Sequence, residues 1–130
     1  MVESRAGQAQ GAHPGAPDAH AAHRILIVDD DVDARESLGL LLELDGHRVA
    51  YAGNGEQAIR CEREFAPVLV LLDLGLPDIG GEDVARRMRE GGSSARIVAL
   101  SGAPGSDEAR VFDARLTKPA RVEELTAYLP

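Results

Sequence analysis

Short apolar runs in this chain end at polar or charged residues. The runs cover residues 25–28 before Asp29 and Asp30, 68–72 before Asp73, 97–100 before Ser101, and 116–117 before Lys118 and Pro119. The run 68–72 is apolar at every position, which a strand requires when helices cover both faces of its sheet. We therefore expect these runs to be strands of one buried parallel sheet.

Segments with helical spacing lie between the runs. Ala34, Leu38, Leu41 and Leu42 repeat as one apolar face of a helix predicted over 33–44. The other predicted elements are strands over 48–52 and 114–117, helices over 55–64 and 82–90, a short helical piece over 106–112, and a last helix carrying Val122, Leu125 and Leu129. This alternation predicts an α/β fold with a doubly wound, flavodoxin-like, five-stranded parallel sheet in the order 2-1-3-4-5.

The length of 130 residues and the hydrophobic content of 44% suffice for one domain with a single core. Residues 1–23 contain almost no large aliphatic side chains, so they cannot offset the entropy of ordering. We predict a disordered tail over 1–23 and one domain over 24–130. His13, His20 and His23 fall in the tail, where we expect solvated side chains rather than metal ligands.

The net charge of −8 disfavours binding to nucleic-acid phosphates or to an anionic membrane, so we expect protein partners. No apolar stretch reaches the ~18 residues that a bilayer span needs, and the N-terminus does not read as a signal peptide. A cytoplasmic location is therefore expected. The lone Cys61 excludes an internal disulfide, and its helical spacing with Ala58 predicts a packing role.

The carboxyl ends of parallel strands meet at one edge of a sheet, so Asp29, Asp30, Asp73, Ser101 and Lys118 should converge there. Two carboxylates ~4 Å apart repel by roughly 4 kcal/mol at an effective dielectric constant of 20, which a bound dication removes. For Asp29 and Asp30 taken alone, capping of the following helix explains the pair equally well. The convergence of all five side chains favours a Mg²⁺ site for phosphoryl transfer.

Residues 24–129 resemble a receiver domain of the two-component response-regulator family. The matching pieces, in the family's order, are ILIVDDD, VLVLLDLGLPDIGG, IVALSG and LTKP. The resemblance implies that Asp73 accepts a phosphoryl group from a histidine kinase, a phosphotransfer protein or a small phosphodonor. It also implies that Asp29, Asp30, Asp73 and the backbone carbonyl of Gly75 hold Mg²⁺.

The resemblance further implies that Lys118 pairs with the phosphoryl group and that Ser101 hydrogen-bonds it, with Gly102 beside the site. The peptide bond between Lys118 and Pro119 is expected to be cis, as is usual in the family. A compact ammonium on a flexible stem can follow a moving phosphoryl oxygen, and a hydroxyl can couple phosphorylation to a loop movement.

Three places depart from the family pattern. The segment between Ser101 and Lys118 is short by more than a helical turn, which predicts a shortened fourth helix. Arg115 stands where the family commonly has an aromatic switch residue, and Gly80 stands where an Asp is usual. A guanidinium cannot enter an apolar slot unpaired, so we expect phosphorylation of Asp73 to be read out through a remodelled surface, or hardly at all.

The chain ends soon after Lys118, so no DNA-binding module is expected to follow, and output should pass through protein contacts of a monomer or weak dimer. We expect no turnover of a separate substrate.

A haloacid-dehalogenase-type phosphatase would need a second Asp where Gly75 stands. Residues 53–58 fit the dinucleotide fingerprint G-x-G-x-x-G/A, although a turn before a helix also explains these glycines. A receiver that has lost signalling is the remaining alternative.

Overall fold

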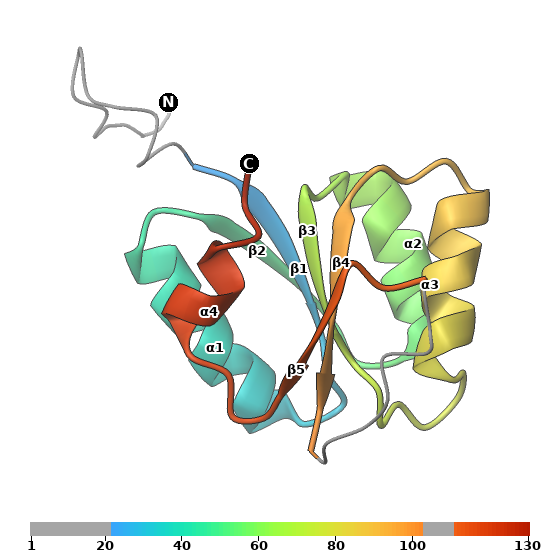
Figure 1. Cartoon of the computed structure of the whole chain (residues 1–130), viewed down its shortest axis with the longest axis horizontal. Coiled ribbons are helices and arrows are strands. Elements are labelled where there is room, and N and C mark those ends of the chain that lie inside the picture. Colours follow the sequence, from blue (N-terminus) through green and yellow to red (C-terminus); the bar gives the residue numbers. More distant parts are fainter. Residues whose placement is uncertain (1–21, 103–110) are drawn as a thin grey trace.

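Strands and helices alternate along the chain (Figure 1). The computed structural model describes residues 22–102 and 111–130. Their elements are β1 (Arg24–Val28), α1 (Val32–Leu44), β2 (Arg48–Ala52), α2 (Gly55–Phe65), β3 (Leu69–Asp73), α3 (Gly81–Glu90), β4 (Arg96–Ser101), β5 (Ala114–Thr117) and α4 (Val122–Thr126). The predicted boundaries of these strands and of α1 to α3 are met to within one residue.

The five strands form one parallel sheet in the order β2-β1-β3-β4-β5, which confirms the predicted topology. Val28 at the end of β1 pairs with Leu72 in β3, and Asp73 pairs with Leu100 in β4. The ends of β1, β3 and β4 therefore lie at one edge of the sheet. The polar residues at the ends of these strands are therefore neighbours at that edge.

Two layers of helices bury the two faces of the sheet, with α1 and α4 on one side and α2 and α3 on the other (Figure 1). The α2/α3 side is packed by sheet residues Leu26, Val28, Val70, Leu72 and Ile97 together with Ala58, Val84, Ala85 and Met88. The α1/α4 side is packed by Ile25, Ile27, Leu69, Leu71, Val98 and Leu100 together with Leu42 and Leu125. Because alternate strand residues serve opposite layers, both sides of each central strand are apolar.

The predicted apolar face of α1 is only half correct. Leu42 is buried and Leu38 is partly buried against the core, but Ala34 is exposed and Leu41 is 51% exposed. The contact stripe instead includes Gly39, where an added Cβ would lie 2.6 Å from Cζ of Tyr51. The absence of a side chain at this position lets the Tyr51 ring of β2 lie across the helix.

The chain around β5 can be compared with the prediction only in part. The helical piece expected over 106–112 falls mostly outside the described residues, so the shortened fourth helix stays a prediction. Val111 and Phe112 are described; they lie outside any helix and pack against the α2/α3 core. Leu125 of α4 is buried in the α1/α4 core, and Leu129, which follows α4, packs against that core. No helix in the described ranges has the length and apolarity that crossing a bilayer requires.

His23 does not behave as a solvated tail residue. Its ring stacks on that of His47 with 5.6 Å between centroids, and its backbone N–H donates to Nδ1 of His47 at 3.2 Å. His47 is only 8% exposed, and its Nε2 lies 3.5 Å from a carboxylate oxygen of Asp45. The pair connects the start of β1 to the turn that precedes β2.

This burial predicts a pH-dependent stability. Burial lowers the pKa of His47 below its ordinary value of 6.5, although the Asp45 carboxylate opposes the shift. The unfolded chain therefore binds the proton more readily, so the contribution is complete above pH 6.5 and is lost as the pH falls below it. We expect the free energy of unfolding in urea to fall from pH 8 to pH 5 by more in the wild type than in His47→Gln. Equal slopes in the two proteins would contradict this assignment.

Candidate functional site

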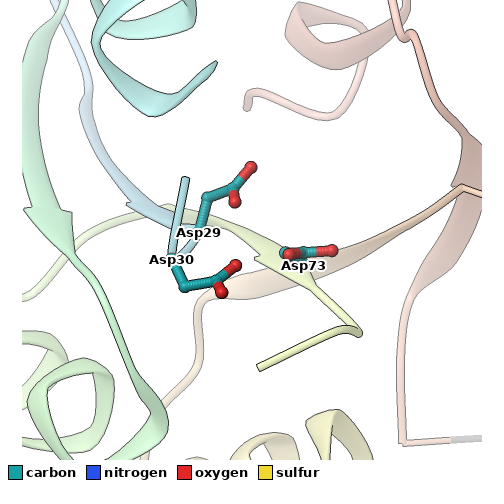
Figure 2. Close-up of side chains that lie close together, drawn as sticks. All are labelled: Asp29, Asp30 and Asp73. Atoms are coloured by element: carbon teal, nitrogen blue, oxygen red, sulfur yellow. The ribbon is translucent and has the colours of Figure 1, made fainter. Parts of the chain in front are cut away.

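Asp29, Asp30 and Asp73 come together at the carboxyl edge of the sheet. Asp29 and Asp30 directly follow β1, and Asp73 is the last residue of the neighbouring strand β3. One carboxylate oxygen from each of the three lies within 4.8 Å of the others. Figure 2 shows the three side chains gathered at the ends of these two strands. The predicted convergence of the acidic residues is present in the structure.

The inner two carboxylates are held in place by backbone donors. Asp29 is 7% exposed and Asp73 is 8% exposed, whereas Asp30 is exposed. The N–H of Asp31 donates to Oδ1 of Asp29 at 2.9 Å, and the N–H of Gly75 donates to Oδ1 of Asp73 at 3.2 Å. Each bond fixes the orientation of its carboxylate at the edge of the sheet.

Helix capping does not account for the acidic pair. The side chain of Asp31 caps α1 by accepting a hydrogen bond from the N–H of Ala34 at 3.2 Å. Asp29 and Asp30 take no part in that cap. The guanidinium of Arg35, a residue that the sequence reasoning missed, donates to the backbone carbonyl of Asp29 at 3.0 Å and fixes the end of β1.

Lys118 supplies the cation of the site. Its Nζ lies 3.2 Å from Oδ1 of Asp73 and 3.3 Å from Oδ2 of Asp29. Burial alone would lower the pKa of Lys118, but the hydrogen bond and charge of Asp73, followed by those of Asp29, outweigh it and raise the pKa above 10.5. The ammonium is therefore charged at neutral pH. The peptide bond between Lys118 and Pro119 is cis.

The donor set fits Mg²⁺. The three carboxylates carry one negative charge each, and Lys118 balances only one of them, so a dication would neutralise the remainder. Carboxylate and carbonyl oxygens are the ligands that Mg²⁺ prefers, and this ion keeps several waters that a phosphate can displace. Gly75 lies in the loop that follows β3, two residues after Asp73.

Ser101 and Arg115 form a contact that the sequence did not predict. Ser101 ends β4, and Nη2 of Arg115 on β5 donates to its hydroxyl oxygen at 3.4 Å. The backbone pairing of β4 and β5 continues past this contact, because the N–H of Lys118 donates to the carbonyl of Ser101 at 2.7 Å. Gly102 follows Ser101 and is exposed. The guanidinium thus lies against a hydroxyl group rather than in an apolar slot.

Asp78 is a second residue that the sequence reasoning missed. Its carboxylate accepts hydrogen bonds from the N–H groups of Gly55 at 2.8 Å and Glu56 at 3.1 Å. The bond from Gly55 is the main reason that the pKa of Asp78 lies below its ordinary value. Asn54 caps the same helix through the N–H of Gln57 at 2.8 Å. These amides at the start of α2 are the donors that a dinucleotide phosphate would need, so the fingerprint at 53–58 is explained as a capped turn.

Comparison with known proteins supports the resemblance seen in the motifs. The family model described as "Response regulator receiver domain" matches residues 25–129. The chain is 35% identical over 122 residues to sensor histidine kinase AtsR of Burkholderia thailandensis, covering 88% of this chain and 20% of that protein. It is 38% identical over 109 residues to DNA-binding response regulator MtrA of Mycolicibacterium paratuberculosis, covering 80% of this chain and 48% of that protein. The chain thus spans half or less of the length of these curated relatives.

Solved structures agree with the fold. The response regulator protein TrrA of Thermotoga maritima, in complex with Mg²⁺-BeF, matches with a TM-score of 0.73 and 32% identity. The match covers 81% of this chain and 94% of that chain. Both the sequence and the three-dimensional structure therefore place the acidic cluster on the same kind of scaffold.

Proposed function

This chain belongs to the response regulator receiver family, and we propose that Asp73 is its phosphoacceptor, taking the phosphoryl group from a phosphohistidine in a histidine kinase or a phosphotransfer protein. One observation carries the proposal: carboxylates from β1 and β3 meet within 4.8 Å of one another and share the ammonium of Lys118. Gathering like charges gives no structural benefit, whereas phosphoryl transfer requires an anionic nucleophile inside a cluster of cations.

The transfer step follows from the charges in the site. A carboxylate oxygen of Asp73 attacks the phosphorus atom and forms a new O–P bond, while the P–N bond to the donor histidine breaks and its electron pair stays on the ring nitrogen. Mg²⁺ held by Asp29, Asp30, Asp73 and the carbonyl of Gly75 would neutralise the approaching anions. Lys118 already contacts Asp73 at 3.2 Å, so its ammonium can pair with a phosphoryl oxygen after only a small movement.

The same residues define the modified state. We propose that Ser101 donates its hydroxyl hydrogen to the phosphoryl group and that Gly102 leaves room beside it. Water returns the site to its starting state by attacking phosphorus, which releases phosphate and restores the Asp73 carboxylate. A separate phosphomonoester is not expected to be hydrolysed, because Gly75 stands where the phosphatase family needs a second carboxylic acid.

Phosphorylation can be tested on the intact chain with acetyl phosphate. We expect the mass of the protein to increase by one phosphoryl group when Mg²⁺ is present, and to stay unchanged when EDTA removes the metal. The adduct should be lost in hydroxylamine, which cleaves acyl phosphates. Lack of any adduct in Mg²⁺ would contradict the proposal and would favour a receiver that has lost signalling.

The lifetime of the acyl phosphate should depend on Gly75. A Cβ added at this position would lie 3.7 Å from Oδ2 of Asp73 and would meet no atom at a closer distance. A larger side chain can therefore be accommodated beside the phosphoryl group, where it would obstruct the attacking water. We expect Gly75→Met to lose its phosphoryl group several-fold more slowly than the wild type, as followed by intact mass over time.

Gly80→Met is the matched control for this change. Gly80 lies in the same loop, and a Cβ there has no atom within 4 Å. We expect its rate of phosphoryl loss to equal that of the wild type. Equal rates in the wild type and Gly75→Met would contradict the role given to Gly75.

We propose that output passes through contacts with a downstream protein. The net charge of −8, which includes the three carboxylates of the acidic site, opposes direct binding to DNA phosphates. The relatives that are DNA-binding regulators are about twice as long as the region that matches this chain. Their DNA-binding function therefore belongs to whole proteins of which this chain matches only about half. A pull-down with phosphorylated and unphosphorylated protein would identify a partner that distinguishes the two states.

A further inference from the structure

Arg115 lies on β5, and β4 separates it from β3, the strand that ends at Asp73. Its neighbours on β5, Ala114 and Leu116, pack into the α1/α4 core, so the alternation of a strand directs Arg115 to the opposite face. Ser101 shares that face, and Nη2 of Arg115 donates to its hydroxyl oxygen at 3.4 Å. The contact thus connects β5, at the edge of the sheet, to the strand beside Asp73.

Ser101 in turn lies close in register to the proposed phosphoacceptor. Asp73 on β3 pairs with Leu100 on β4, which is the residue directly before Ser101. The N–H of Leu74 donates to the carbonyl of Leu100 at 3.1 Å, so the two strands stay paired to their ends. A group that bonds the Ser101 hydroxyl is therefore separated from Asp73 by one strand spacing, within the reach of an arginine side chain.

The contact between Arg115 and Ser101 is a weak one for a charged group. A neutral hydroxyl at 3.4 Å is a long and poor acceptor for a guanidinium, whereas phosphate oxygens accept two parallel N–H bonds from the same group. Phosphorylation of Asp73 would add a charge of about −1.5 to −2 in this region. The change creates a much stronger acceptor beside an arginine that is already half-buried at the site.

We propose that Arg115 is a phosphoryl ligand in this chain, a role that rests on Asp73 being phosphorylated. Before phosphorylation its guanidinium donates to Ser101; afterwards it donates to a phosphoryl oxygen, while Lys118 pairs with another. The Arg115 side chain then moves toward the centre of the sheet and changes the exposed surface of β5. The sequence led us to expect a remodelled or weak readout of phosphorylation, because Arg115 replaces the aromatic residue. In this proposal, the charge of the Arg115 guanidinium provides that readout.

Nuclear magnetic resonance tests this on the wild-type protein. Beryllofluoride with Mg²⁺ serves as the phosphoryl mimic, and the Nε–Hε resonances of the arginines in ¹⁵N-labelled protein are recorded with and without it. We expect the Arg115 resonance to shift together with the backbone amides of Ser101 and Lys118, while that of Arg96, at the opposite end of β4, stays in place. Arg115→Lys assigns the signal by removing it.

The outcomes separate the two proposals. Shifts of the Ser101 and Lys118 amides without a shift of the Arg115 side chain would overturn the role of Arg115 and leave the proposed function intact. No shift anywhere would overturn the proposed function, and the role of Arg115 with it.

Variants measure the size of the effect. We expect Arg115→Met to bind beryllofluoride about 10-fold more weakly than the wild type, as a lost charge-assisted bond implies. Arg115→Lys, which keeps the charge but not the planar fork, should recover part of that loss. Arg96→Met removes the same charge at the far end of β4 and should bind as the wild type does. Equal affinities of the wild type and Arg115→Met would overturn the inference.

Discussion

Asp73→Asn should abolish phosphorylation by acetyl phosphate. The carboxamide has nearly the shape of the carboxylate and can still accept the N–H of Gly75, so the fold is expected to be preserved. A neutral amide, however, is a much weaker nucleophile than a carboxylate and cannot carry the charge that transfer to phosphorus requires. We expect no phosphoryl adduct by intact mass at times when the wild type is fully modified.

Asp33→Asn provides the control for this experiment. Asp33 is an exposed acid in the first turn of α1 and lies outside the group of carboxylates that converge at the sheet edge. We expect its phosphorylation to match that of the wild type. If Asp73→Asn were modified as rapidly as the wild type, the phosphoacceptor would be another residue, and peptide mapping would identify it.

Asp30→Asn should have opposite effects on stability and on metal binding. Without metal, the substitution removes one of three negative charges whose oxygens lie within 4.8 Å of one another, and Lys118 pairs with the other two, Asp29 and Asp73. Because Asp30 is exposed and screened by water, we expect a gain in the free energy of unfolding of no more than about 1 kcal/mol. The same change removes a ligand, so Mg²⁺ should bind at least ~10-fold more weakly.

Urea unfolding with and without Mg²⁺ separates these two effects. Circular dichroism is the suitable signal, since the chain contains no Trp. The wild type should become more stable as Mg²⁺ is added, because a ligand that binds only the folded state stabilises it. Asp30→Asn should begin more stable and gain little. A variant that is less stable without metal and equally responsive to Mg²⁺ would show that Asp30 is not part of the metal site.

The sheet could be predicted from the sequence because its strands are apolar on both faces and end abruptly. The run ending at Asp73 has no polar residue that would permit a surface position, so its burial between helix layers follows directly. The buried face of α1 was harder to predict, because Leu41 has helical spacing with Leu38 and yet is 51% exposed. The helix has more apolar residues than its narrow contact with the sheet can bury, and periodicity alone does not say which are left outside.

The acidic cluster could also be predicted, because it depends on where strands end and not on how side chains turn. Contacts made by long side chains across the chain could not be predicted in the same way. The bond from Arg115 to Ser101 depends on the face of β5 and on a rotamer, and the cap that Asp78 provides to α2 joins residues that are distant in sequence. The Pro77-Asp78 pair does indicate a turn with an available carboxylate, which was the one signal present for the second contact.

The position of Lys118 has a consequence for the protein at rest. Its ammonium bridges Asp29 and Asp73, so the site contains an internal counterion that is covalently part of the chain. We therefore expect the domain to remain folded without divalent ions, so that magnesium depletion would stop the proposed phosphorylation without unfolding the protein. Loss of signalling under such conditions would be reversible as soon as the ion returns.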